Sequence, residues 1–375
     1  MITCALVILL SAFNGMEKLI DKIYSEFDPS ITITPASGKT FFEQDVNWES
    51  LSKVDGIKVL SKGHEELVVL EYSRPLEEEM DYRVKRTNAR LYGVDDSFLE
   101  LIQANKHTRG AKPVLKDADG PRGIIGIGLI QKLEASLSSE FTIFIPKKNI
   151  KMSSDKPFFK KKVKASSVLV YQNRMVNEET FLWPLSELRK LTKDTSNSLT
   201  HIYIRAKAST DLDDLKTRIQ KVLGNDFVVK TYLQKNELVF KTSKSEKLIL
   251  TLILIFVFIL ACFNLVSSIT MIYLEKKENF MALKSMGLTK KGLFHVFYFQ
   301  GIQISFIGVI LGALLGYLIC WLQSYFEFIH MAPEQPYPIG FSWVDFLTII
   351  ISVSLLSTLF SYVTVKLLMR KELKA

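Results

Sequence analysis

The sequence predicts a membrane protein with four transmembrane α-helices, the first one truncated, and a large α+β domain between the first and the second. Three observations support this fold class. Apolar runs longer than the ~20 residues needed to cross a bilayer occupy 248–274, 293–322 and 344–369. A shorter apolar run opens the chain at 1–14. Residues 17–246, more than half of the chain, have an ordinary water-compatible composition.

The first run, MITCALVILLSAFN, is too short for a complete span. Its 14 residues reach about 21 Å as a helix, against a hydrocarbon core of about 30 Å. A cleaved signal peptide, the alternative, would need basic residues at its start, and no Lys or Arg precedes Lys18. We therefore expect 1–14 to be a span whose start is missing. Helical apolar spacing continues to Phe27 and stops at Asp28-Pro29, which predicts an outward stalk.

Lysines set the orientation, because short cytoplasmic loops are rich in Lys and Arg. The loop between the second and third apolar runs carries five lysines, and the tail after the fourth run is also basic. By contrast, 323–343 has no Lys or Arg. The expected layout begins with a first span at 1–14 and an external domain with helical stalks at 15–246. The second span follows at 247–274, a cytoplasmic helix at 275–292 and the third span at 293–323. A short external loop at 324–343 leads to the fourth span at 344–369 and a cytoplasmic tail at 370–375.

The external domain reads as a mixture of strands and helices. Short β-branched and aromatic runs predict strands at 30–34, 66–72, 141–146, 167–171 and 201–205. Helical patterns lie at 126–137, 185–191 and 211–223, the last with Asp211 as its N-cap. A second stalk is expected at 233–246. We expect an α+β domain, with a seam between two lobes near 83–108.

Motifs for catalysis, cofactor binding or metal binding do not occur in the sequence. SGKT at 37–40 lacks the first glycine of a phosphate loop, and RGIIGIG at 122–128 lacks the third glycine of a dinucleotide loop. The five histidines have no metal-ligand spacing, and the three cysteines all lie in apolar runs. We expect no catalytic residue, no cofactor, no metal and no nucleic-acid partner for this chain.

Small residues line one side of the third span. In lipid, such residues let helices approach closely, so we expect a packing surface, with a sliding contact as the alternative. The residues of this stripe are Gly301, Ser305, Gly308, Gly312 and Gly316. Asn264 lies in the middle of the second span, where a buried amide needs a partner, so we expect it to face another helix.

The cytoplasmic segment EKKENFMALKSMGLTKKG, at 275–292, has a short apolar face between lysine-rich flanks. The apolar face consists of Phe280, Met281, Leu283, Met286 and Leu288, and Gly287 interrupts it. A helix of this kind either docks into a groove of a partner or lies on the membrane surface. Docking is the favoured interpretation, because the sequence shows no motor of its own.

The segment ACFNLVSSITMIYLEKKENFMALKSMGLTKKGLFHVFYFQG, at 261–301, resembles the signature of FtsX-like ABC-transporter permeases. The shared features are the Glu-Lys exit from the second span, the Ala-Leu-Lys-Ser-Met-Gly segment and the glycine-rich third span. Phe263-Asn264 followed by Ser267 and Met271 is most similar to the lipoprotein-releasing branch. The external segments at 91–96 and 123–146 are similar to that family's MacB-like periplasmic domain.

The resemblance implies a non-catalytic permease in the bacterial inner membrane, with its large domain in the periplasm. It also implies partners: a cytoplasmic ABC ATPase dimer that binds ATP and Mg, a second permease that is the same or a paralogous chain, membrane lipids, a lipoprotein cargo and a periplasmic carrier. ATP-driven movement would pass through the stalks and release the lipoprotein from the outer leaflet. The residues expected to contact the ATPase are Glu275, Lys276, Lys277, Phe280, Met281, Leu283, Lys284, Met286 and Gly287.

Two alternatives stay open from the sequence. The first is a permease of the same superfamily that exports another substrate or controls a cell-wall hydrolase. The second is a membrane-anchored sensor whose external domain binds a ligand.

Overall fold

The chain divides into two compact units in its computed structural model, which describes residues 1–75, 82–147, 157–276, 279, 282, 286–332 and 335–371. The first unit consists of Met1–Ile20 and Leu238–Ala375, and it holds the long apolar helices. The second unit is Asp21–Glu237, and it holds the main β-sheet. The second unit is thus the domain that the sequence places outside the membrane.

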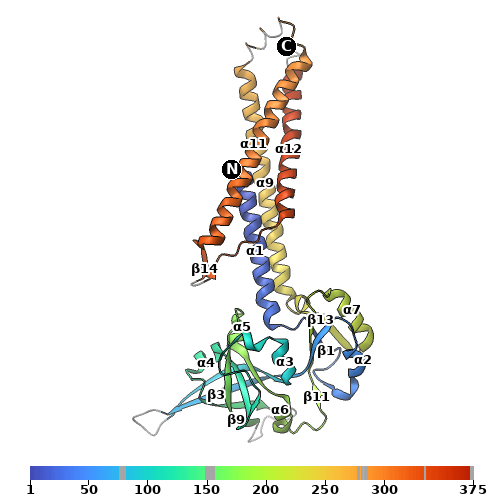
Figure 1. Cartoon of the computed structure of the whole chain (residues 1–375), viewed down its shortest axis with the longest axis vertical. Helices are drawn as coiled ribbons and strands as arrows, with labels where there is room; N and C mark the ends of the chain where they lie inside the picture. The colour runs from blue at the N-terminus through green and yellow to red at the C-terminus, as the bar shows by residue number, and fades with distance from the viewer. Residues whose placement is uncertain are drawn as a thin grey trace. The chain divides into compact units, whose positions relative to one another are not determined.

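The described residues contain four helices that are long and apolar enough to cross a membrane. These are α1 (Ile2–Phe27), α9 (Glu237–Glu275), α11 (Lys290–Phe326) and α12 (Trp343–Lys371), drawn in Figure 1. The predicted fold class is confirmed by these helices. Because α9 starts at Glu237, the predicted second stalk and second span form one helix, preceded by the short α8 (Tyr232–Lys235).

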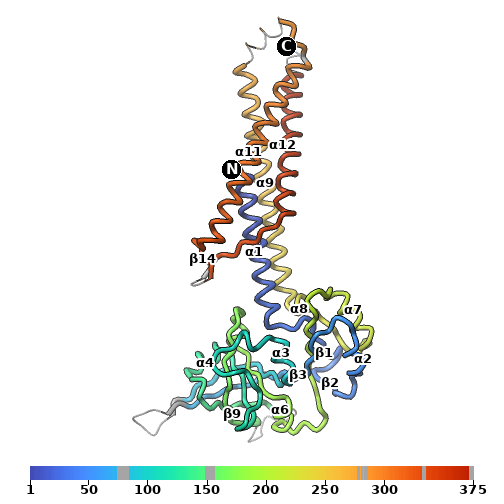
Figure 2. Tube along the Cα trace, in the orientation of Figure 1, coloured from blue at the N-terminus to red at the C-terminus, as the bar shows by residue number. Residues whose placement is uncertain are grey.

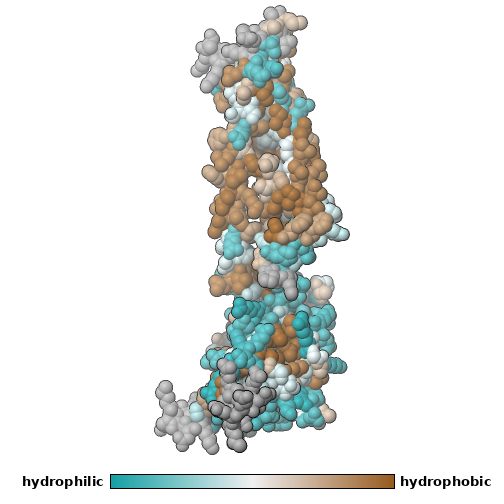
Figure 3. All heavy atoms as spheres, turned by 90° about the vertical axis from the view of Figure 1, so that its left-hand side faces the viewer, coloured by the Kyte–Doolittle hydropathy of each residue, from teal (hydrophilic) through white to brown (hydrophobic). Residues whose placement is uncertain are grey.

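Buried apolar clusters hold the first unit together. Val7 of α1 packs with Val309 and Ala313 of α11 and with Ile349 and Val353 of α12. A second cluster joins α9, α11 and α12 through Ile269, Tyr273, Phe297 and Val365. Outside these clusters, the long helices expose mostly apolar side chains, which form the brown belt in Figure 3. A surface of this kind suits hydrocarbon and not water.

The second unit is built around an 11-stranded sheet. Six of its strands close into a ring in the order β3, β4, β10, β7, β9 and β8, which returns to β3. Their bounds are β3 Ile57–Pro75, β4 Tyr82–Val94, β7 Gly120–Gly126, β8 Glu140–Pro146, β9 Phe158–Leu169 and β10 Thr180–Pro184. Large side chains such as Phe141, Phe181 and Trp183 fill the ring and are fully buried.

The first part of β3 continues into an open part of the same sheet, in the order β13, β1, β12, β3. These strands are β1 (Ile31–Pro35), β12 (His201–Ala206) and β13 (Phe227–Thr231). Two helices, α2 (Trp48–Ser52) and α7 (Leu212–Leu223), share a buried core with this part. Figure 2 shows the trace of these elements, with β1 and α2 in blue and α7 in yellow-green. The strand β3 therefore belongs to both parts of the domain.

The remaining elements of the second unit are short. They are β2 Phe41–Phe42, a 3-10 turn Glu43–Asp45, α3 Asp96–Leu101, a 3-10 turn Ala104–Lys106, β5 Thr108–Gly110, β6 Lys116–Asp117, α4 Ile127–Leu133, α5 Arg174–Glu179, α6 Leu185–Thr192 and β11 Ser198–Leu199. In the first unit, β14 (His330–Ala332) pairs with β15 (Gln335–Pro336) between α11 and α12.

The predicted strands and helices of the domain are all present, with shifted ends, but the predicted seam near 83–108 is wrong. That stretch starts with β4, which pairs with β3 from Gly63↔Val94 to Pro75↔Tyr82. Its charged side chains lie on the outside of the ring, where Arg86 pairs with Glu71 of β3. The helix expected at 126–137 ends at Leu133, because Glu134 turns into the left-handed region at φ +52°.

Candidate functional site

The end of α1 from Asp21 onward belongs to the second unit, where Phe27 is buried. This side chain is 4% exposed and belongs to a buried cluster with Tyr92, Phe98 and Tyr171. Its ring meets those three rings edge-on at centroid distances of 5.9, 6.4 and 5.3 Å, respectively. Edge-to-face packing of this kind fixes the position of an aromatic side chain as well as burying it. The last residue of α1 is therefore held in the core of the domain.

Arg205 of β12 secures the same helix end by hydrogen bonds. Its Nη1 donates to the carbonyl oxygen of Ser25 at 2.9 Å and its Nη2 to that of Glu26 at 3.4 Å. Its Nε donates to the carbonyl oxygen of Leu101, the last residue of α3, at 2.8 Å. The carbonyls of a last helical turn lack partners within the helix and carry partial negative charge, so a cation stabilises them. Burial lowers the pKa of the Arg205 guanidinium, an effect that the nearby Tyr171 and Asp28 oppose.

Asp28, directly after α1, binds the segment through which the chain leaves the domain. Its Oδ1 accepts a hydrogen bond from Lys235 Nζ at 2.8 Å, and its Oδ2 accepts one from Asn236 Nδ2 at 2.7 Å. Two helical turns before Asp28, Asp21 also accepts a hydrogen bond from the hydroxyl group of Tyr232. The chain enters the domain at α1 and leaves it at α8, so these bonds tie the two connections together.

We call Phe27, Asp28, Arg205, Lys235 and Asn236 the stalk anchor. Sequence reasoning placed a helix stop at Asp28-Pro29 but did not identify these residues as a group. The signal was available only in part, because an Asp after a helix and an Arg in a strand are both common on a solvated surface. Their proximity depends on β1 and β12 pairing side by side, with Ile31 opposite Ile204.

The small-residue stripe of α11 faces two different helices. A side chain at Gly301 would meet Ser361 of α12, since a Cβ built there lies 2.1 Å from the Ser361 Oγ. At Gly312 and Gly316 a Cβ would lie 2.9 Å from the Cβ atoms of Thr3 and Val7, both in α1. Ser305 donates to the carbonyl oxygen of Gly301 at 2.8 Å. Gly308 has no neighbour within 4 Å in the described structure, so it does not take part in this packing.

Asn264 is exposed, and no helix among the described residues of this chain covers it, so the helix that it is expected to face is not found within the described structure. Its side chain is exposed on α9, next to Phe263, which is 64% exposed. The second span packs through the opposite face, where Cys262 and Ile269 are buried. An asparagine in an apolar span does not by itself reveal its direction, because the sequence does not say which face of α9 packs against the other helices.

Most of the predicted ATPase-contacting residues lie outside the described part of the structure. These are Lys277, Phe280, Met281, Leu283 and Lys284. Glu275 and Lys276 are exposed at the end of α9, and Met286 is 83% exposed. Gly287 has φ +98°, a conformation that favours glycine. The docking role of this segment stays a prediction.

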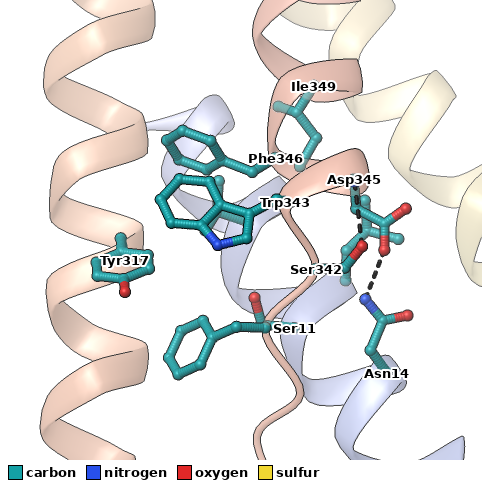
Figure 4. A pocket seen from close by; sticks show the side chains of 11 residues that line it. Ser11, Asn14, Tyr317, Ser342, Trp343, Asp345, Phe346 and Ile349 are labelled. Carbon is teal, nitrogen blue, oxygen red and sulfur yellow. Dashed lines mark hydrogen bonds between the residues drawn. The ribbon is translucent and has the colours of Figure 1, made fainter.

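A polar contact joins α1 to the start of α12 (Figure 4). Asn14 Nδ2 donates to Asp345 Oδ2 at 2.6 Å, and the Asp345 backbone N–H donates to Ser342 Oγ at 3.3 Å. On the same face of α1, the Gly340 N–H donates to the carbonyl oxygen of Ser11 at 2.8 Å. These groups border a small cavity of about 40 Å³ that also touches Tyr317 and Trp343. Sequence reasoning missed this contact, although Asp345 is an acid inside an apolar run and could have been noticed for that reason.

Glu65 lies at the centre of a group of polar side chains in the domain. Glu65 accepts a hydrogen bond from Tyr203 at 2.6 Å and lies 3.7 Å from His201 Nδ1 and from Arg90 Nη1. Burial lowers the pKa of His201, an effect that Glu65 opposes. Among the described residues, no group of three or more His, Cys, Asp or Glu side chains could hold a metal ion.

Residues 251–373 match the family described as FtsX-like permease C-terminal. This part of the chain is an FtsX-like permease domain. The chain is 25% identical over 228 residues to the lipoprotein-releasing system transmembrane protein LolC of Neisseria meningitidis serogroup B, covering 58% of this chain and 54% of that protein. It is 29% identical over 155 residues to LolC of Buchnera aphidicola subsp. Schizaphis graminum, covering 40% and 39%, respectively. The chain thus spans about half or less of the length of the curated relatives it matches.

Two solved structures also align with part of this chain. One is the periplasmic region of MacB from Actinobacillus actinomycetemcomitans, at 13% identity and a TM-score of 0.37, covering 59% of this chain and 97% of that one. The other is the extracellular domain of the ABC-type transporter YknZ from Gram-positive bacteria, at 14% identity and a TM-score of 0.35, covering 54% and 99%.

The FtsX-like match and the LolC relatives agree with the layout of the chain. The LolC relatives are described as transmembrane proteins of lipoprotein-releasing systems, and the described part of this chain has four apolar helices with a large domain between the first and second. The short loop after α9 is rich in lysine, which places it in the cytoplasm. The chain is therefore a multi-pass inner-membrane protein whose large domain lies in the periplasm.

Proposed function

We propose that this chain is the non-catalytic membrane subunit of an ABC transporter that releases lipoproteins from the outer leaflet of the inner membrane. In this proposal, a cytoplasmic ATPase dimer binds ATP and Mg and drives movement of the spans. The domain in the periplasm then performs the work on the cargo. The observation that supports this most directly is the stalk anchor, taken together with the FtsX-like permease domain.

The stalk anchor supports force transmission for a physical reason. A domain that hangs from one flexible connection can rotate without doing work, whereas one fixed at both connections follows the helices. Here Arg205 and Phe27 fix the end of α1, and Asp28 ties α1 to Lys235 and Asn236 beside the start of α9. These charge-assisted bonds are each stronger than bonds between neutral groups.

The cytoplasmic end of α9 is the proposed contact with the ATPase. Glu275 and Lys276 are exposed there, and the segment up to Gly287 carries the lysines and apolar residues predicted to dock. An apolar helix face docks into a groove by burying the residues that successive turns place on that face, so one charge placed there weakens the contact strongly.

A second permease is the proposed neighbour of Asn264. An amide exposed to hydrocarbon lacks hydrogen-bond partners and costs free energy, so a polar residue in a span normally faces protein. In this chain Asn264 faces outward beside the exposed Phe263 and Met271. We propose that the same or a paralogous chain covers this face of α9.

The cargo proposal explains the need for ATP. Each CH₂ group of a lipid anchor contributes about 0.8 kcal/mol to membrane binding. Lifting an acylated lipoprotein out of the outer leaflet and passing it to a periplasmic carrier is therefore costly without an energy source. The names of the curated relatives, which are lipoprotein-releasing proteins, support this cargo.

Co-purification and charge substitutions test the proposal. In mild detergent, an ATPase subunit should co-purify with this chain. The variants Leu283→Glu and Met286→Glu should still insert into the membrane, but their lipoprotein release should be reduced. Met175→Glu is the matched control, because Met175 is 60% exposed in the periplasmic domain and should have no effect. Normal lipoprotein release by both loop variants would refute the coupling role.

The same experiment separates the alternatives. A chain that co-purifies with an ATPase but leaves lipoprotein release unchanged when deleted would be a permease for another substrate or a regulator of a cell-wall hydrolase. A chain that purifies without any ATPase and binds a ligand through its periplasmic domain would be a sensor.

A further inference from the structure

A cavity of about 270 Å³ lies between α1, α9 and α12, and it shares Leu10, Asp345 and Ile349 with the cavity of Figure 4. Its apolar walls include Leu10 of α1, Phe258 of α9 and Val353 of α12. Exposed residues such as Ile255 and Ser352 border it, so the cavity opens onto the outer surface of the bundle. In a membrane, that surface faces the acyl chains of lipids.

The hydroxyl groups in the cavity do not make it polar. Thr251 donates to the carbonyl oxygen of Lys247, Thr348 to that of Val344, and Ser352 to that of Thr348, at 2.6 to 2.7 Å. A hydroxyl bonded to its own helix in this way presents mainly its apolar side to a neighbour. The walls therefore suit a hydrocarbon chain.

Polar groups gather only at one end of the cavity. Asp345, in the first turn of α12, is the one carboxylate among the cavity's described lining residues. One helical turn before Thr251, Lys247 forms an ion pair with Glu17 of α1 at 3.1 Å. Both features lie toward the periplasmic ends of their helices. The cavity thus changes from polar near the periplasmic surface to apolar further into the membrane, as a lipid does.

The charges at the polar end leave one carboxylate oxygen available. Glu17 and Lys247 neutralise each other, and Asn14 donates to Oδ2 of Asp345. Among the described residues, no hydrogen bond or ion pair reaches Asp345 Oδ1, and Asp345 lies in the first turn of α12. An excess negative charge at the depth of the lipid headgroups favours a cationic group there.

We propose that this cavity binds one bilayer phospholipid with a primary-ammonium headgroup, of the phosphatidylethanolamine type. One acyl chain lies along the wall formed by Leu10, Phe258 and Val353, and the ammonium group binds Asp345 Oδ1. The lipid joins three helices that the chain itself packs incompletely at this level. This assignment does not depend on the cargo or on the ATPase, because it requires only that the four helices span the membrane.

Lipid exchange and native mass spectrometry of the purified full-length chain test the proposal. The probes are phosphatidylethanolamine and phosphatidylglycerol with identical acyl chains, so that only the headgroup differs. The wild-type chain should retain phosphatidylethanolamine about tenfold better, which is the effect of one hydrogen bond to a charged group. Asp345→Asn keeps the acceptor for Asn14 but removes the charge, so the preference should fall to about one.

A cavity-filling substitution tests the acyl-chain part separately. Ser352→Trp should fill the cavity and release both lipids, whereas Ile351→Trp should retain them, because Ile351 is 63% exposed on α12 and does not line the cavity. Equal retention of the two lipids by the wild-type chain, or an unchanged preference in Asp345→Asn, would overturn the assignment. Displacement of the phospholipid by an equal amount of an acylated, N-blocked peptide would also overturn it, since the cavity would then be a cargo site.

Discussion

Arg205 Nη1 donates a hydrogen bond to the backbone carbonyl oxygen of Ser25, 2.9 Å away in the last turn of α1. The same guanidinium also reaches the end of α3 through the carbonyl oxygen of Leu101. One half-buried cation therefore stabilises the C-terminal ends of two helices, where the helix dipoles place negative charge. Several consequences of this arrangement and of the span contacts can be measured.

Replacement of Arg205 should loosen the end of α1. In Arg205→Met the carbonyl oxygens of Ser25 and Leu101 lose their donors, which should cost roughly 2 kcal/mol of domain stability. Hydrogen exchange of residues 21–28 in the full-length chain should become faster, and Arg205→Lys should restore part of the protection. The control is Arg86→Met, since Arg86 is mostly exposed and should leave that exchange unchanged. Equal protection of residues 21–28 in Arg205→Met and in the wild type would contradict the role of Arg205 in stabilising the end of α1.

Removal of the Asp28 carboxylate should separate the two connections of the domain. Asp28 is 8% exposed and binds both Lys235 and Asn236. Asp28→Ala should destabilise the domain by roughly 2–3 kcal/mol and speed hydrogen exchange at 231–237. Asp55→Ala is a matched control, because Asp55 also binds a lysine but is 84% exposed on its side chain. If Asp55→Ala lost as much protection at 231–237 as Asp28→Ala, the burial of Asp28 would not be the cause of the effect.

The glycines of α11 should differ in their tolerance to alanine. A Cβ at Gly316 would lie 2.9 Å from both the Cys4 carbonyl oxygen and the Val7 Cβ, so α1 must shift. Gly316→Ala should therefore lower the melting temperature of the detergent-solubilised chain, by an amount typical of overpacking at about 1–3 kcal/mol. Gly308→Ala should leave it unchanged, since nothing lies within 4 Å of that position in the described structure. A similar loss in both variants would show that the close contact with α1 is not the cause, because alanine is the better helix former and gives no intrinsic reason for a loss.

Acid should weaken the turn that leads to β11. Burial would raise the pKa of Asp194, but hydrogen bonds from Ser196 and Ser198 lower it to about 2 from an ordinary value of 3.8. A carboxyl group with a lowered folded-state pKa stabilises the fold above its unfolded pKa, and this contribution disappears as the pH falls from about 4 to about 2. In denaturant titrations, Asp194→Asn should reduce the difference in stability between pH 6 and pH 3. An identical pH dependence in the variant and the wild type would exclude Asp194 as its source.

The sequence predicts the spans well because twenty-residue apolar runs have few other uses. The strands of the domain were found where β-branched residues dominate, as at 201–205, and β4 was missed because its outward face is charged. Asp211 was identified correctly as an N-cap, and it accepts from the backbone N–H groups of Asp213 and Asp214. Signals that depend on a few neighbouring residues were therefore predictable.

Features that join distant segments were not predictable. The contacts of Arg205 with Ser25 and of Asn14 with Asp345 link residues 180 and 331 positions apart. Asn264 was placed in the right span, but its direction depends on which side of α9 meets the bundle. The ATPase-contacting residues remain a prediction, since most of them lie outside the described structure.

The strand β3 belongs to the closed ring and to the open part of the sheet, and it runs without interruption from Ile57 to Pro75. A hinge needs a few residues that can change their backbone angles, and at Gly63, where the two parts meet, β3 is paired with His201 of β12 on one edge and with Val94 of β4 on the other. Near Gly63, β3 passes from the open part of the sheet to the closed ring. Cleavage of the chain or a flexible insertion at this position would create a hinge between these two parts. The continuous strand β3 accordingly resists opening and closing of the two parts of the periplasmic domain relative to each other.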